Sequence, residues 1–99
     1  MANRAPTISS HVLDTSRGAP AAGVRIDLSR VGVDGVETAV GSALTDADGR
    51  VADLLGTPLS VGTYRLRFSV GERSPLFASL AVDVRVDDVG RSYHVPLLL

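Results

Sequence analysis

The stretch Gly62-Thr63-Tyr64-Arg65-Leu66-Arg67-Phe68-Ser69-Val70 alternates between apolar and polar residues along its length. Successive side chains of a β-strand point to opposite faces, so a period of two predicts a strand with one buried and one exposed face. The buried face of this strand would carry Tyr64, Leu66, Phe68 and Val70. The stretch therefore predicts a strand that covers an apolar core.

Six further segments have β-strand character, because they are rich in aliphatic residues or alternate in polarity; they span residues 7–14, 24–29, 36–44, 50–55, 80–87 and 92–99. Turn signals such as Gly32-Val33-Asp34-Gly35 and Asp46-Ala47-Asp48-Gly49 separate them. No segment shows a convincing helical period. Seven short strands at regular spacing indicate an all-β fold, a single β-sandwich domain over residues 1–99.

The composition excludes several classes of function. The chain has 99 residues and a formal net charge of −1, so it offers no basic surface to nucleic acid or to an anionic membrane. It contains no cysteine, which excludes disulfides, thiolate metal ligands and a cysteine nucleophile. No apolar run is long enough to cross a bilayer, and residues 1–6 lack the apolar region of a signal peptide. We therefore expect a cytoplasmic protein without nucleic-acid or membrane partners.

The chain has two histidines, and both fall in predicted strands. In the last strand, Tyr93-His94-Val95-Pro96-Leu97-Leu98-Leu99, alternation puts His94 and Pro96 on one face and Tyr93, Val95, Leu97 and Leu99 on the other. A histidine beside a proline that cannot donate to the ladder is an unusual use of a strand. The other histidine, His11, lies in the first strand. The question is whether the fold brings the two imidazoles to one site.

Each candidate residue also has a simpler interpretation when it is taken alone. His11 and His94 could be hydrogen-bonded strand residues, and Arg50 could be a solvated residue after a tight turn. Two histidines without a third ligand nearby make a poor zinc site. The aspartates of the turn, Asp46 and Asp48, lack the later ligand positions of a calcium loop. The sequence therefore indicates no metal site.

Four motifs stand in order along the chain: His11-Val12-Leu13-Asp14-Thr15 with Gly18 and Pro20-Ala21-Ala22-Gly23-Val24, then Thr45-Asp46-Ala47-Asp48-Gly49-Arg50, then Gly62-Thr63-Tyr64-Arg65-Leu66-Arg67-Phe68, then Tyr93-His94-Val95-Pro96-Leu97-Leu98-Leu99. Together they resemble the transthyretin-like proteins, whose enzymatic branch is the 5-hydroxyisourate hydrolases of purine degradation. The resemblance extends from about Ser10 to Leu99. One such motif is a weak signal, whereas four in register are a specific one.

The resemblance implies a transthyretin-like (prealbumin-like) sandwich of two antiparallel four-stranded sheets. It also implies a homotetramer, a dimer of dimers, with active sites in a channel between the dimers. The implied activity is hydrolysis of the small molecule 5-hydroxyisourate to 2-oxo-4-hydroxy-4-carboxy-5-ureidoimidazoline in urate degradation, with no cofactor and no metal. The catalytic residues of the hydrolases fall on His11, Arg50 and His94, a trio that the thyroid-hormone carrier branch lacks.

The sequence departs from the family pattern in two places. The hydrolases end with a further strand that closes in Tyr-Arg-Gly-Ser, whose serine belongs to the active site, whereas the sequence here ends at Leu99. The family also carries a short helix before the strand predicted at 80–87, and the 71–75 connection is too short for it. We expect a shortened, diverged member or a sequence without its tail, whose last strand is left as an exposed edge.

The candidate residues fit the chemistry that opening a ring with water requires. A neutral imidazole can take a proton from water near pH 7 and return it later. A guanidinium can hold a carbonyl or an oxyanion with a fixed fork of donors. Either His11 or His94 would be the general base, the other would orient water or donate a proton, and Arg50 would bind the substrate. Two alternatives stay open: a non-catalytic binding or scaffold domain, and an enzyme that acts on another cyclic substrate.

Overall fold

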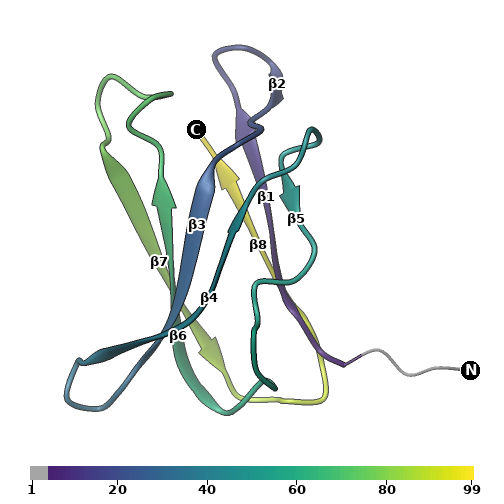
Figure 1. The fold of residues 1–99 in the computed structure, drawn as a ribbon, viewed down its shortest axis with the longest axis vertical. Coiled ribbons are helices and arrows are strands. Elements are labelled where there is room, and N and C mark those ends of the chain that lie inside the picture. Colours follow the sequence, from purple (N-terminus) through teal and green to yellow (C-terminus); the bar gives the residue numbers. More distant parts are fainter. Residues whose placement is uncertain (1–4) are drawn as a thin grey trace, which may run out of the picture.

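The computed structural model describes residues 5–99, which form two four-stranded β-sheets (Figure 1). In the first sheet, β8 (Tyr93–Leu98) runs along one edge of β1 (Ile8–Asp14), and two short strands, β2 (Ala19–Pro20) and β5 (Arg50–Val51), pair with its other edge. The second sheet has the order β4 (Glu37–Leu44), β3 (Arg25–Val31), β6 (Gly62–Ser69) and β7 (Ser79–Val86). Residues 5–99 contain no helix, and so no helix that could cross a membrane.

The β-sandwich predicted from the sequence is confirmed, and each of the seven predicted strands corresponds to a strand of the structure. Two details differ. The short strand β2 lies in a segment that we expected to be only a turn. The strand predicted at 50–55 forms a regular ladder only over Arg50–Val51, although the Leu54 amide still donates to the Ile8 carbonyl oxygen of β1 at 2.8 Å. Between these positions the Asp53 carboxylate accepts a hydrogen bond from the Leu55 amide at 2.9 Å, which is typical of a local turn.

The resemblance implied two antiparallel sheets, and every pair in the described part of the chain is antiparallel except one. The exception is the pairing of β1 with β8, which is parallel. Parallel strands cannot be joined by a tight hairpin and need a long crossover connection. Here the chain leaves β1, builds the second sheet, and returns as β8 on the other edge of β1. The first and last strands therefore lie side by side (Figure 1).

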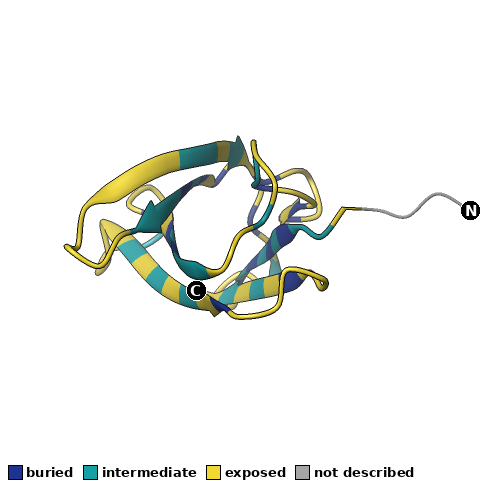
Figure 2. Cartoon of the chain, turned by 90° about the horizontal axis from the view of Figure 1, so that it is seen from below, coloured by how far each residue is buried: buried dark blue, intermediate teal, exposed yellow. Residues whose placement is uncertain are grey.

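The core lies between the two sheets and is mostly aliphatic (Figure 2). The apolar positions of the 62–70 stretch are all buried, as the alternation predicted: Tyr64, Leu66, Phe68 and Val70. β1 contributes Ile8 and Val12, both fully buried, to the same core. Burial of each side chain of this size contributes about 1.5–3 kcal/mol. This burial fixes which face of β1 points into the sandwich and which points out.

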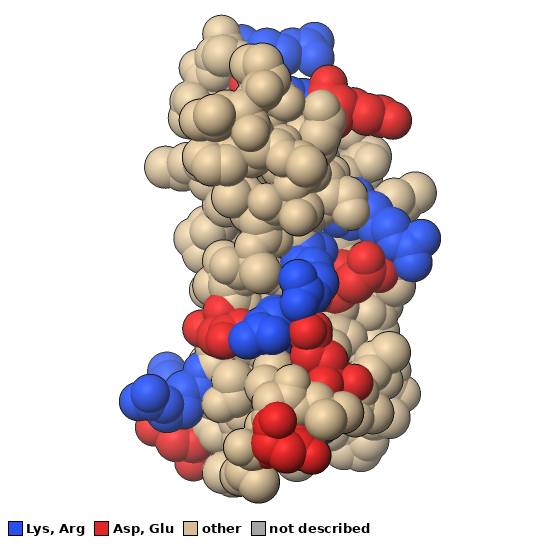
Figure 3. Space-filling view, turned by 90° about the vertical axis from the view of Figure 1, so that its left-hand side faces the viewer, with Lys and Arg blue, Asp and Glu red and all other residues tan. Residues whose placement is uncertain are grey.

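The outer face of the second sheet carries a network of ion pairs, and Figure 3 shows one side of the molecule where basic and acidic side chains lie next to one another. Arg65 donates to both carboxylate oxygens of Asp83, at 2.6 and 2.9 Å, and to Glu37 at 3.2 Å. Glu37 also accepts from Arg67 at 2.6 Å and from the Ser29 hydroxyl at 2.9 Å. These donors, Arg67 foremost, lower the pKa of Glu37 from 4.5 to about 2.

The lowered pKa of Glu37 predicts a specific loss of stability in acid. A carboxylate with a depressed pKa in the folded state stabilises the fold above its unfolded pKa, and this contribution disappears as the pH falls. For Glu37 the loss should run from about pH 4.5 down through about pH 2. We expect Glu37→Gln to remove this part of the pH dependence, so that its free energy of unfolding falls less steeply than that of the unchanged protein over this range.

Urea titrations monitored by circular dichroism at several pH values would measure this difference. Glu72→Gln is the matched control, because Glu72 is exposed in the turn after β6 and forms no ion pair within residues 5–99. An acid loss of equal steepness in Glu37→Gln and in the unchanged protein would contradict the prediction.

Candidate active site

β1 presents its two faces to two different environments. Ile8, Ser10 and Val12 point into the sandwich and are buried, and the residues between them point outward and are half-buried: Ser9, His11 and Leu13. Ser10 is polar yet buried, and its hydroxyl donates to the Val95 carbonyl oxygen at 2.7 Å. The alternation of β1 therefore places one imidazole on the outer face of the first sheet.

The turn at residues 46–50 lies against β1 and positions the start of β5. The Asp46 carboxylate accepts hydrogen bonds from the backbone amides of Asp48 and Arg50, both at 2.9 Å. Gly49 has a φ of 74°, in the left-handed region, and a Cβ at this position would run into the Val12 carbonyl oxygen. The Val12 amide donates to the Gly49 carbonyl at 2.8 Å. The turn therefore holds Arg50 against β1.

His11 and Arg50 lie directly opposite each other in the β1–β5 ladder. The Nε2 atom of His11 is 2.8 Å from the carbonyl oxygen of Asp48. Because a carbonyl oxygen can only accept, this Nε2 carries a proton and donates it. The Arg50 side chain is exposed, and its guanidinium forms no ion pair within residues 5–99. Its positive charge is therefore available to an anionic ligand.

His94 lies on β8, where the parallel pairing sets it beside Ser9 of β1. The Nδ1 atom of His94 is 2.8 Å from the Ser9 hydroxyl oxygen. The neighbouring residue, Tyr93, points into the sandwich and is only 8% exposed, and its hydroxyl donates to the Asp88 carbonyl at 3.0 Å. Because neighbours on a strand face opposite ways, His94 is exposed on the outer face that also carries His11.

The structure thus brings all three residues named from the sequence to one face of the first sheet. His11 is opposite Arg50, and His94 is opposite residue 9, two positions along β1 from His11. A cavity of about 450 Å³ lies at this face, and it is lined by His11, Leu13, Pro20, Asp48 and Arg50. His94 is not among the lining residues. One chain therefore gathers the three groups on one surface without enclosing them.

Two supporting residues of this face were not predicted from the sequence. Alternation shows that Ser9 shares a face with His11, but its contact with His94 depends on the register of β1 and β8. Asp46 was considered only as a calcium ligand, whereas its carboxylate holds the turn before Arg50. The Asp-x-Asp-Gly pattern is typical of such side-chain-stabilised turns and was the available signal. Within residues 5–99, no three His, Asp or Glu side chains gather closely enough to hold a metal ion.

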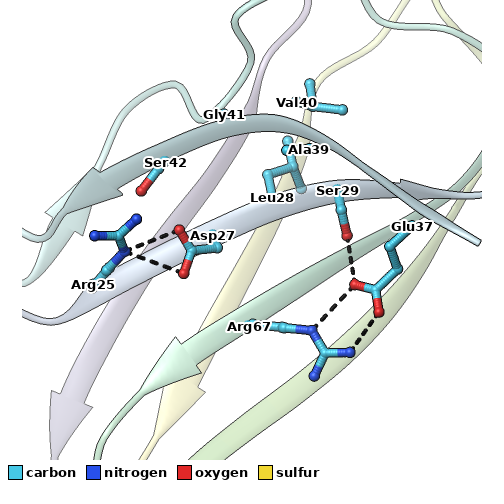
Figure 4. Close-up of a pocket in the computed structure, with 10 residues that line it drawn as sticks. All are labelled: Arg25, Asp27, Leu28, Ser29, Glu37, Ala39, Val40, Gly41, Ser42 and Arg67. Carbon is cyan, nitrogen blue, oxygen red and sulfur yellow. Dashed lines mark hydrogen bonds and ion pairs between the residues drawn. The ribbon is translucent and has the colours of Figure 1, made fainter.

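A larger cavity, of about 570 Å³, lies on the outer face of the second sheet (Figure 4). Its charged side chains bind one another, since Arg25 pairs with Asp27 at 3.0 Å and Arg67 pairs with Glu37 at 2.6 Å. No histidine lines this cavity. An anionic ligand would have to displace these carboxylates, which compete for the same guanidinium groups. We therefore take the outer face formed by β1, β5 and β8 as the candidate active site.

Comparisons with known proteins show which family this chain resembles over most of its length. The chain matches the model of the HIUase/Transthyretin family over residues 8–99. It is 43% identical over 105 residues to the 5-hydroxyisourate hydrolase of Deinococcus radiodurans, with 95% of this chain and 87% of that protein covered. It is 41% identical over 110 residues to a bifunctional protein of uric acid degradation from Arabidopsis thaliana, with 95% of this chain but only 34% of that longer protein covered.

The fold agrees as well. The solved structure of the 5-hydroxyisourate hydrolase of Klebsiella pneumoniae superposes with a TM-score of 0.78 at 32% identity, covering 94% of this chain and 88% of that one. The matched range of the family model, residues 8–99, includes every strand of the sandwich and all three candidate residues. With sequence and topology in agreement over nearly its whole length, the chain belongs to the HIUase/Transthyretin family.

Proposed function

We propose that this chain hydrolyses 5-hydroxyisourate to 2-oxo-4-hydroxy-4-carboxy-5-ureidoimidazoline in urate degradation. The observation that carries the proposal is the placement of His11, Arg50 and His94 on one sheet face. The relatives from Deinococcus radiodurans and Klebsiella pneumoniae bear the name of this hydrolase and match 95% and 94% of the chain. The cytoplasmic location expected from the sequence stays a prediction.

The reaction adds water across a cyclic amide bond. The water oxygen forms a bond to a ring carbonyl carbon while an imidazole removes one of the water protons, and the π pair of the carbonyl moves onto its oxygen. The guanidinium of Arg50, which forms no ion pair within residues 5–99, stabilises this oxyanion with its fork of N–H donors. The carbonyl then re-forms, the bond to the ring nitrogen breaks, and an imidazolium returns the proton to that nitrogen. The substrate gains one water and is neither oxidised nor reduced.

Removal of a catalytic side chain should abolish most of the rate without unfolding the protein. We expect Arg50→Ala to lower kcat/KM by about 10²- to 10³-fold through loss of oxyanion stabilisation. His94→Ala should lower it by about 10²- to 10⁴-fold through loss of proton transfer. The decay of freshly generated 5-hydroxyisourate, followed by ultraviolet absorbance, measures both.

Arg25→Ala is the matched control for these variants, because Arg25 is an exposed arginine of β3 whose pair with Asp27 is solvated. Its rate should stay within about threefold of the unchanged protein, since exposed pairs contribute little to stability. If a well-folded protein gave no acceleration over buffer, the hydrolase proposal would fail. A binding or scaffold domain, or an enzyme for another cyclic substrate, would then be favoured.

We also propose that the active form is a homotetramer, a dimer of dimers. The outer face of β8 leaves His94, Pro96 and Leu98 exposed, and Leu98 reaches 67%. Exposed apolar side chains beside a charged site are typical of a surface that another protein covers. A second copy over this sheet would exclude water from the site, and this would strengthen the attraction between Arg50 and an oxyanion.

Light scattering coupled to size-exclusion chromatography tests the assembly. At micromolar concentration the scattering mass should be about four times that of the 10.3 kDa chain. The exposed apolar side chains of β8 are the physical reason, because an assembled face would bury them. A strict 10.3 kDa monomer that still hydrolyses 5-hydroxyisourate would contradict the proposed assembly and leave the activity intact.

A further inference from the structure

We propose that Ser9 is a positioning residue, which accepts a hydrogen bond from Nδ1–H of His94 and so leaves the Nε2 lone pair of His94 to act as the general base. The inference rests on the proposed hydrolase function and adds a division of labour between the two histidines. It also gives the half-buried Ser9 hydroxyl a role in catalysis, in addition to its place in β1.

The two imidazoles are held by different nitrogens. His11 is held through Nε2, which donates to the carbonyl oxygen of Asp48 at 2.8 Å. His94 is held through Nδ1, at 2.8 Å from the Ser9 hydroxyl oxygen, and Nε2 of His94 has no hydrogen-bond partner within residues 5–99. Within residues 5–99, Nε2 is therefore hydrogen-bonded in His11 but has no partner in His94. This difference makes His94 the imidazole that can reach a water molecule with its Nε2.

The role of His94 as a base determines which partner donates in its hydrogen bond with Ser9. A neutral imidazole has one N–H and one lone pair, so a lone pair on Nε2 requires the proton on Nδ1. The Ser9 oxygen can accept a hydrogen bond from this Nδ1–H, because a hydroxyl has two lone pairs. When Nε2 takes a proton from water, the imidazolium keeps the same Nδ1–H···Oγ hydrogen bond. No side chain has to move during the transfer, which is the condition for an efficient base.

The protons balance over one turnover. Nε2 of His94 removes a proton from the water that attacks the ring carbonyl, and it later gives this proton to the ring nitrogen that leaves. His94 returns to its neutral form with the proton on Nδ1. His11 can donate through Nε2 throughout, in agreement with its contact with the Asp48 carbonyl. Ser9 exchanges no proton with the substrate and acts only through His94.

The register of the sheet makes Ser9 the hydroxyl that can do this. Ser9 is opposite His94 in the β1–β8 ladder. The next hydroxyls on this face, Thr7 and Ser92, bind each other, since the Thr7 amide donates to the Ser92 hydroxyl oxygen at 2.9 Å and their side-chain oxygens are 3.4 Å apart. Ser92 makes no hydrogen bond with His94 in the described part of the chain. Ser92→Ala is therefore the matched control.

The proposal is first tested on the unchanged protein by nitrogen-15 NMR of the histidine rings at about pH 9, where imidazole side chains are ordinarily neutral. The chemical shifts and long-range couplings of His94 should report a proton on Nδ1, and those of His11 a proton on Nε2. In Ser9→Ala the His94 ring should change toward a mixture of tautomers, whereas Ser92→Ala should leave it unchanged. A proton on Nε2 of His94 in the unchanged protein would overturn the proposal.

Kinetics supply the second test. Ser9→Ala should lower kcat by roughly 10- to 100-fold and leave KM within about twofold, because the hydroxyl orients the base and does not touch the substrate. Ser9→Thr keeps the hydroxyl and should restore kcat to within about threefold. Equal kcat in Ser9→Ala and the unchanged protein would overturn the inference. Absence of hydrolysis by the unchanged protein would instead overturn the hydrolase function. The role of His94 as general base would then fall as well, even if NMR placed its proton on Nδ1.

Discussion

β1 and β8 pair in parallel from Ile8 opposite Tyr93 to Leu13 opposite Leu98, and the arrangement of the candidate site depends on this register. A shift by one residue would turn every side chain of β8 to the other face, because side chains alternate along a strand. His94 would then point into the core and Tyr93 out of it. Burial of Tyr93, with its hydroxyl bonded to the Asp88 carbonyl at 3.0 Å, resists such a shift. The apolar core thus determines the direction of the His94 imidazole.

The same strand, β1, contributes residues both to the core and to the candidate site on its outer face. Its inner residues, Ile8 and Val12, belong to the core, while His11 on its outer face meets Arg50 from β5. The turn that carries Arg50 is bonded to β1 through Val12 and Gly49 at 2.8 Å. The site is therefore assembled by main-chain hydrogen bonds of one central strand with two neighbours. On the second sheet, Arg65 and Arg67 are instead paired with Glu37 and Asp83.

Much of this could be predicted from the sequence, for identifiable physical reasons. Period-two alternation placed Tyr64, Leu66 and Phe68 in the core and His94 on the opposite face from Tyr93, because one buried face dictates the pattern. The family resemblance supplied His11, Arg50 and His94 as a set. The contact between Ser9 and His94 could not be predicted, since their 85-residue separation is closed only by the tertiary pairing of β1 with β8. Nor could the shortening of β5 to Arg50–Val51, since the apolar residues that follow, such as Leu54, are also compatible with a strand.

The measurement that tests the central claim most directly is an NMR titration with urate, a stable anionic purine related to the proposed substrate. If the outer face of the first sheet is the substrate site, the ring signals of His11 and His94 and the side-chain signals of Arg50 should shift together on addition of urate, with one common saturation curve. Shifts confined to Arg25, Glu37 and Arg67, which line the cavity of the second sheet, would contradict the account.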